Sequence, residues 1–97
     1  MRLEREEVAC ILAAVRASDA TARVYLFGSR TDNGKQGGDI DLLVLSENLS
    51  SSDETRIDVA IQEKLGEQKI DVLVRGPDAV KRDPFIAHIF KSAVELV

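Results

Sequence analysis

The chain has 97 residues and a formal net charge of −4, from 13 Lys and Arg against 17 Asp and Glu. Hydrophobic residues make up 44% and charged residues 31%, which predicts one globular domain over residues 1–97 with a single modest core. No apolar run reaches membrane-spanning length, and the acidic balance disfavours binding of nucleic acid by charge alone. A single cysteine, Cys10, excludes an intramolecular disulfide framework, so we expect a cytoplasmic protein.

The first half of the chain predicts a helix followed by two strands. Residues 3–18 carry an apolar stripe at helical spacing, formed by Val8, Ile11, Leu12 and Val15. Residues 23–27 form a short apolar run that ends at Gly28, and residues 39–45 form a second one after a polar turn.

The second half predicts a helix, a strand and a last helix. Residues 51–65 open with a capping-box pattern, Ser51 and Glu54, and close at Gly66. Residues 69–74 form the third strand. Asp83 as N-cap and Pro84 at the first helical position begin the last helix. This order predicts a small α/β (α+β) domain, in which a mixed sheet of three or more strands has helices packed mainly on one face.

Aspartates interrupt two of the predicted strands. Because residues two apart in a strand point to the same side, Asp39 and Asp41 share a face opposite Ile40 and Leu42. Asp71 takes the same place in the third strand, so three carboxylates would meet near one edge of the sheet. Such a cluster needs a cation, and Mg²⁺ prefers oxygen ligands of this kind. Two such ions would suit phosphoryl or nucleotidyl transfer.

The alternative is that the aspartates are exposed strand residues that oppose aggregation. For one aspartate that interpretation would be the better one. For three, each near the start of an otherwise apolar strand, we favour a functional site, because aspartate is disfavoured in strands.

The Gly-Ser pair after the first strand is the second signal. Gly28 permits close approach of the backbone to a ligand, and the amides of such a turn can hold anionic oxygens. Ser29 adds a hydroxyl, and Arg30 adds a guanidinium that matches phosphate geometry. A Gly-Ser pair alone is a weak signal, and its weight comes from its place just before the paired aspartates.

Together these motifs resemble a known family. The segments "FGSR", "GGDIDLLVL" and "KIDVLV" are similar to those of the minimal nucleotidyltransferases of the DNA polymerase beta superfamily. Their shared pattern is a hydrophobic residue, Gly-Ser, a spacer, Asp-hydrophobic-Asp, and a third aspartate on a later strand. The spacer here has nine residues between Ser29 and Asp39, one fewer than small members usually have, and Asp32 makes it acidic.

The resemblance implies a role for each motif residue. Gly28 and Ser29 would hold the triphosphate of ATP, with Arg30 assisting. Asp39, Asp41 and Asp71 would be the catalytic and metal-binding carboxylates for a two-ion Mg²⁺ site, with Asp71 helping to deprotonate the attacking hydroxyl. The implied reaction is the transfer of a nucleoside monophosphate from ATP to a hydroxyl acceptor.

The resemblance also implies a partner. Larger family members add a helical domain for base and acceptor, whereas small ones are often encoded beside a HEPN-domain protein, as in a toxin–antitoxin pair. The expected acceptor is a tyrosine of such a partner, within a possible homo- or hetero-oligomer. Two alternatives stay open: a catalytically weak module that neutralises its partner by binding alone, and transfer to a small molecule or an RNA end. Nucleic acid and membrane partners are not expected.

Overall fold

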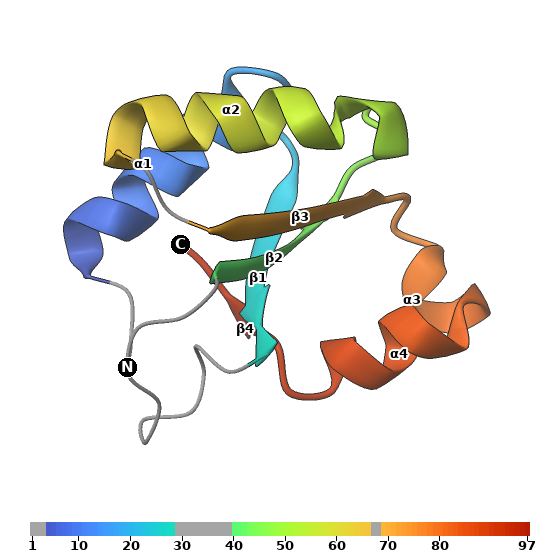
Figure 1. Ribbon diagram of the computed structural model, residues 1–97. Helices are drawn as coiled ribbons and strands as arrows, with labels where there is room; N and C mark the ends of the chain where they lie inside the picture. The colour runs from blue at the N-terminus through green and yellow to red at the C-terminus, as the bar shows by residue number, and fades with distance from the viewer. Residues whose placement is uncertain (1–3, 29–39, 67–68) are drawn as a thin grey trace.

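The computed structural model describes residues 4–28, 40–66 and 69–97 of the chain. Its sheet has four strands in the order β3-β2-β1-β4 (Figure 1). These are β1 (Arg23–Phe27), β2 (Ile40–Leu45), β3 (Ile70–Arg75) and β4 (Val94–Glu95). Strand β1 pairs antiparallel with β2 and β4, whereas β2 and β3 run parallel. The sheet is therefore mixed, as the sequence predicts.

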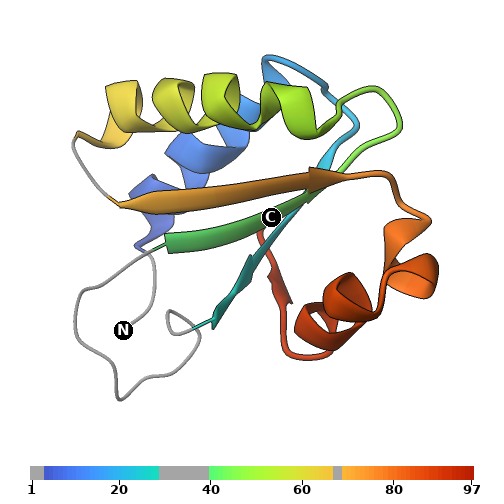
Figure 2. The same cartoon turned by 45° about the vertical axis from the view of Figure 1, so that its right-hand side comes forward.

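Two long helices cover one face of the sheet, α1 (Arg5–Arg16) and α2 (Glu54–Leu65). Figure 2 shows them together above the strands. The predicted apolar stripe of α1 and one face of α2 form this core: Ile11, Val15, Ile57 and Ile61 are fully buried. They pack against alternate strand residues, namely Val24, Leu26, Ile40, Leu42, Val44, Ile70, Val72 and Val74. The two-residue period of the strands thus places the larger core as expected.

The opposite face carries a second, smaller core under two short helices. These are α3 (Ala79–Arg82) and α4 (Pro84–Phe90). Tyr25, Leu43, Leu45 and Ile86 form the buried centre of this core. Asp83 caps α4 as predicted, because its carboxylate accepts hydrogen bonds from the Phe85 and Ile86 amides at 2.9 and 3.4 Å. Helices therefore lie on both faces, the longer pair on the face with the larger core.

The predicted capping box at Ser51 and Glu54 is wrong by one position. The box forms at Ser50 and Asp53, because Ser50 has the extended backbone that an N-cap requires (φ −136°). The first turn is a 3₁₀ helix, η2 (Ser51–Asp53), before α2 begins. Glu54 instead accepts hydrogen bonds from the Val74 amide at 2.9 Å and the Arg75 guanidinium at 2.8 Å. Its carboxylate thus joins the start of α2 to the end of β3.

A buried aspartate links the α1–β1 turn to the end of β2. The Asp19 carboxylate accepts hydrogen bonds from the amide and hydroxyl of Thr21, at 3.0 and 2.8 Å, and from the Ser46 hydroxyl. Asn48 donates a further bond at 3.3 Å. The Ser46 bond, followed by those from Thr21, lowers the pKa of Asp19 from 3.8 to about 2. The charged form of Asp19 therefore stabilises the folded state.

This shift predicts how stability depends on pH. A lowered pKa gives a contribution that is complete above the ordinary value of 3.8 and is lost as the pH falls through about 2. Urea unfolding between pH 6 and pH 2 should show a fall in the free energy of unfolding below pH 4. We expect the Asp19→Asn variant to be less stable at pH 6 and to lose less in that interval. An equal acid dependence in variant and wild type would contradict this assignment.

Candidate functional site

The end of β1 and the starts of β2 and β3 lie at the same edge of the sheet. Phe27, the last residue of β1, pairs with Asp41 near the start of β2, and Asp41 pairs with Asp71 near the start of β3. The three residues therefore lie in a row across the sheet. Adjacent strands lie about 4.8 Å apart, so the backbones that carry Asp41 and Asp71 are direct neighbours.

Both carboxylates lie on the α3–α4 face. Leu43 and Leu73, two residues after Asp41 and Asp71, belong to the second core, and residues two apart share a face. Asp41 is half-buried and Asp71 is exposed. The start of β2 is fixed by a hydrogen bond from the Ile40 amide to the Lys69 carbonyl at 2.9 Å. This bond sets the register that brings the two aspartates together.

Gly28 lies directly against Asp41. Its backbone has φ +78°, a conformation that favours glycine. A Cβ at this position would overlap the Asp41 carboxylate oxygen and lie 3.2 Å from Cγ. Glycine is therefore required at residue 28 for two independent reasons, its backbone angle and the space that Asp41 occupies.

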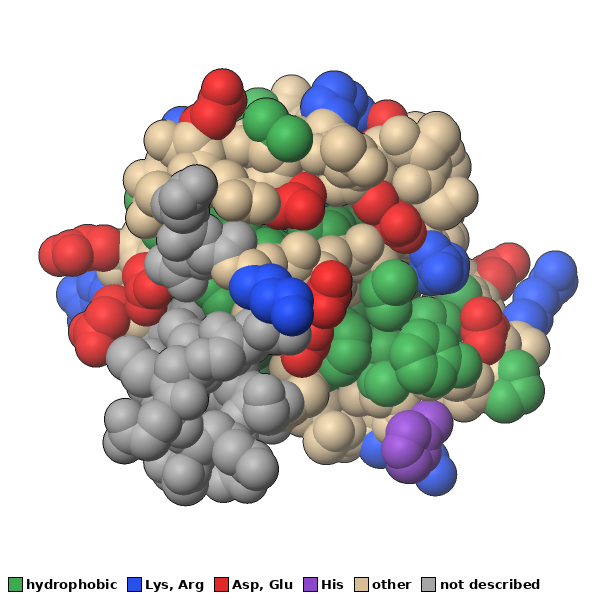
Figure 3. Space-filling model, viewed as in Figure 1, with side chains coloured by type: hydrophobic (Ala, Val, Ile, Leu, Met, Phe, Trp, Pro, Cys, Tyr) green, Lys and Arg blue, Asp and Glu red, His purple; other side chains and the backbone are tan. Residues whose placement is uncertain are grey.

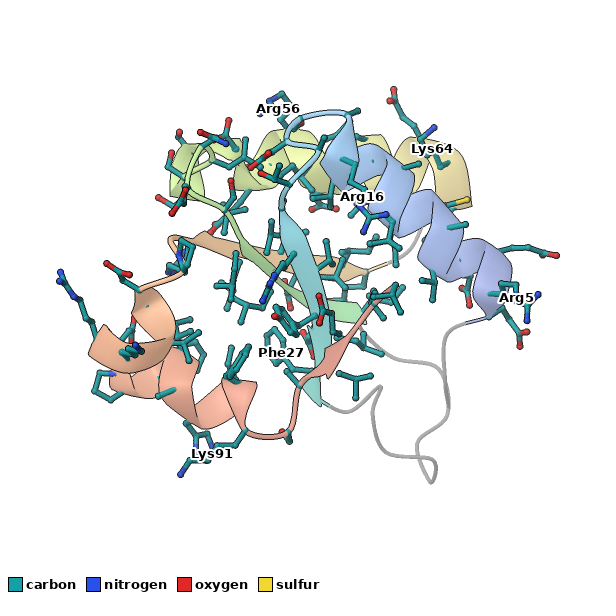
Figure 4. The ribbon with its side chains drawn as sticks, turned by 180° about the vertical axis from the view of Figure 1, so that it is seen from behind. Arg5, Arg16, Phe27, Arg56, Lys64 and Lys91 are labelled. Carbon is teal, nitrogen blue, oxygen red and sulfur yellow. The ribbon has the colours of Figure 1, made fainter. Side chains whose placement is uncertain are left out.

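The surroundings of the pair are partly apolar. Phe27 and Leu73 are half-buried and pack against the second core. Figure 4 labels Phe27 at the end of β1, and Figure 3 shows hydrophobic side chains gathered beside acidic ones, in the area between β3 and α4. The carboxylates thus stand at the border of an apolar surface, where charge interactions are stronger than in open water.

The sequence-predicted site falls into two parts. Gly28, Asp41 and Asp71 lie in the described part of the chain, and the structure brings them to one edge of the sheet. Ser29, Arg30 and Asp39 lie outside the described residues. Within residues 4–28, 40–66 and 69–97, no group of three or more His, Cys, Asp or Glu side chains could hold a metal ion.

Phe27 is a neighbour of the candidate site that the sequence did not single out. It stands next to Asp41 because β1 and β2 pair antiparallel with Phe27 opposite Asp41. The sequence feature that could have indicated it is its position directly before Gly28, where the predicted strand ends.

A comparison with known families agrees with this geometry. The family model described as "Polymerase beta, Nucleotidyltransferase" matches residues 11–97. The chain belongs to the polymerase beta-type nucleotidyltransferase family. No curated protein matches the chain.

The matched range of this nucleotidyltransferase domain includes the whole sheet and both described carboxylates. The small mixed sheet with its helices is consistent with the family's fold. The family typically uses a divalent metal and a nucleoside triphosphate. The donors present fit such an ion, because Asp41 and Asp71, which pair on neighbouring strands, carry carboxylate oxygens of the type that Mg²⁺ binds.

Proposed function

We propose that the protein is a Mg²⁺-dependent nucleotidyltransferase that transfers AMP from ATP to a hydroxyl group. The acceptor we propose is a tyrosine of a HEPN-domain toxin partner, which would make this protein the antitoxin. The observation that carries the proposal is the pairing of Asp41 with Asp71 beside the positive-φ Gly28, in a chain of the polymerase beta-type family.

The residues divide the chemistry between them. Asp41, together with Asp39, would hold Mg²⁺, which supplies charge stabilisation for the triphosphate and the leaving pyrophosphate. Gly28 and Ser29 would position the triphosphate by close backbone approach, and Arg30 would neutralise phosphate charge.

The transfer itself is an in-line displacement at the α-phosphorus. Asp71 accepts the proton of the attacking hydroxyl, a new bond forms between that oxygen and the α-phosphorus, and the bond from phosphorus to pyrophosphate breaks. The exposure of Asp71 supports this role, because the acceptor must reach the carboxylate from outside. Pyrophosphate leaves with the electron pair of the broken bond.

The acceptor is proposed to be a protein, and the site of action the cytoplasm. A net charge of −4 and a site framed by carboxylates disfavour nucleic acid as the acceptor. The half-buried Phe27 and Leu73 beside the carboxylates suit an aromatic acceptor side chain better than a strongly hydrophilic sugar.

The direct test is intact mass spectrometry of the proposed HEPN-domain partner. The two proteins are incubated with ATP and Mg²⁺, and with the metal removed by a chelator. We expect the partner to gain the mass of one nucleoside monophosphate only when metal is present, with the addition on a tyrosine. An unmodified partner under both conditions would contradict the proposal.

A second candidate function is neutralisation of the partner by contact alone. It is favoured by a groove of about 470 Å³ along α1, which Val8, Ala9, Leu12, Ala13 and the exposed Val97 line. Arg5 and Arg16 line the same groove near the two ends of the helix (Figure 4). A partner that covers it would present an apolar stripe flanked by carboxylates.

The two candidate functions predict different outcomes for two variants. If contact alone neutralises the toxin, Ala13→Arg, which fills the groove, should restore toxicity in a growth assay. The Asp41→Asn/Asp71→Asn double variant should then still protect. If transfer neutralises the toxin, the double variant fails to protect while partner binding, measured by co-purification, persists. Protection by the double variant would reject the transfer mechanism, and its failure with binding intact would reject the contact mechanism.

A further inference from the structure

A pocket of about 400 Å³ lies on the α3–α4 face of the sheet, at the end opposite the aspartates. Arg23 and Leu45, which pair where β1 begins and β2 ends, are in its wall, together with Val80 and Phe90 from the helices. Phe27 lies four residue steps after Arg23 on β1, which corresponds to about 13 Å along the strand. The pocket is therefore separate from the proposed transfer site. Its volume is in the range of small-molecule sites, about 300–1,000 Å³.

Tyr25 brings a polar group, its phenol hydroxyl, to this pocket. Only 6% of Tyr25 is exposed, and its ring packs edge-on against Phe90 with centroids 5.0 Å apart at 68°. Among the residues that the structure describes, none forms a hydrogen bond with its hydroxyl. A buried tyrosine hydroxyl usually has a partner, and a ligand in the pocket that Tyr25 lines would provide one.

Two opposite charges stand at the same pocket. Arg23 and Tyr25 share a face because they are two apart on β1, and Leu45 at the end of β2 pairs with Arg23. Glu47, two residues after the end of β2, lines the same pocket. Arg23 and Glu47 are both exposed, and neither forms an ion pair within the described part of the chain. The pocket thus combines a guanidinium, a carboxylate and a phenol with apolar walls from Leu45, Val80 and Phe90.

We propose that this pocket binds a small zwitterion with an apolar, preferably aromatic, body, the chemistry of a free amino acid. The guanidinium of Arg23 would hold the ligand's carboxylate in the two-pronged geometry that this group favours. The Glu47 carboxylate would hold its ammonium group, and the Tyr25 hydroxyl would donate to the ligand's carboxylate. The apolar body would pack against Leu45, Val80 and Phe90.

The Glu47 carboxylate distinguishes this ligand class from polyphosphates and simple anions. An anion bound to Arg23 would meet the negative charge of Glu47, whereas a zwitterion satisfies both side chains. The inference does not rest on the proposed transferase function, because it uses no residue of the Asp41–Asp71 edge. Its test measures ligand binding, so the result is equally informative whether or not the protein has transfer activity.

The test is a titration of the ¹⁵N-labelled full chain, followed by amide chemical shifts. L-phenylalanine is the probe, with 3-phenylpropanoate, which lacks the ammonium, and 2-phenylethylamine, which lacks the carboxylate, as matched controls. We expect saturable shifts at Arg23, Tyr25 and Leu45 with L-phenylalanine. Each truncated probe should bind about tenfold more weakly, as is usual for the loss of one charge-assisted hydrogen bond.

Three variants assign each contact. Arg23→Gln should weaken binding of L-phenylalanine and 3-phenylpropanoate but leave 2-phenylethylamine unchanged. Glu47→Gln should weaken binding of L-phenylalanine and 2-phenylethylamine but leave binding of 3-phenylpropanoate unchanged. Tyr25→Phe removes only the hydroxyl and should weaken L-phenylalanine several-fold, with circular dichroism confirming that each variant is folded.

Several results would overturn the proposal. One is the absence of saturable shifts up to the solubility limit of L-phenylalanine. Another is equal affinity for the three probes, or affinity that Arg23→Gln and Glu47→Gln leave unchanged. Shifts confined to the Asp41–Asp71 end of the sheet would show that the probe binds elsewhere and would equally reject the site.

Discussion

Replacing Asp41 with asparagine is expected to reduce nucleotidyl transfer about a thousandfold or more, with the fold retained. The substitution preserves the shape of the side chain and removes only its negative charge. The carboxylate stands between Gly28 and Asp71, at the place where metal and triphosphate are proposed to meet. Because a carboxylate ligand and the charge it contributes are both lost, binding of Mg²⁺ weakens and the transition state loses its stabilisation.

Asp71→Asn should give a related but separable result. An asparagine cannot accept the proton of the attacking hydroxyl, and loss of a general base typically costs about 10²–10⁴-fold in rate. Binding of Mg²⁺ and ATP should change less than in Asp41→Asn, because Asp71 is exposed and acts on the acceptor. Transfer rates across a Mg²⁺ titration separate the two effects, since added metal partly rescues only a variant with weakened metal affinity.

A matched control is Glu63→Gln on α2. Glu63 is exposed on the helix that covers the other face of the sheet, and the substitution removes the same charge. It should leave the rate of transfer unchanged. Wild-type rates for Asp41→Asn, or an equal loss for Glu63→Gln, would contradict the assignment of the site.

The sequence predicted those parts of the fold that depend on periodicity. Strand β1 spans Arg23–Phe27 as predicted, and the alternation in β2 separates Ile40, Leu42 and Val44 from Leu43 and Leu45. These patterns are strong because a one-residue slip would move every side chain to the wrong face. The same alternation predicts that Asp41 and Asp71 lie on one side of the sheet.

The features that the sequence did not predict depend on tertiary contacts. Strand β4 has two residues, and α3 has four, so neither carries a readable period. The hydrogen bond from the Ser46 hydroxyl to the Asp19 carboxylate joins residues 27 positions apart, which no local pattern indicates. The contact of Gly28 with Asp41 likewise follows from the register of β1 with β2, whereas the sequence indicates only that Gly28 permits close approach of the backbone to a ligand.

Gly28→Ala is expected to lower both stability and activity, and the comparison with Gly66→Ala separates the two effects. Both glycines have positive φ, +78° and +86°, so an alanine at either should cost about 1–3 kcal/mol in the free energy of unfolding. A Cβ at Gly66 has no atom within 4 Å, whereas one at Gly28 overlaps the Asp41 carboxylate.

Only Gly28→Ala should therefore displace Asp41, and a displacement of about 1 Å at a reacting centre can cost about a hundredfold in rate. We expect urea unfolding to show similar losses of stability for the two variants, while the transfer rate falls only for Gly28→Ala. If activity fell equally in both, destabilisation would explain it and the close fit of residue 28 to Asp41 would have no catalytic role. If Gly28→Ala retained full activity, Asp41 would tolerate displacement, and its proposed place beside the triphosphate would be wrong.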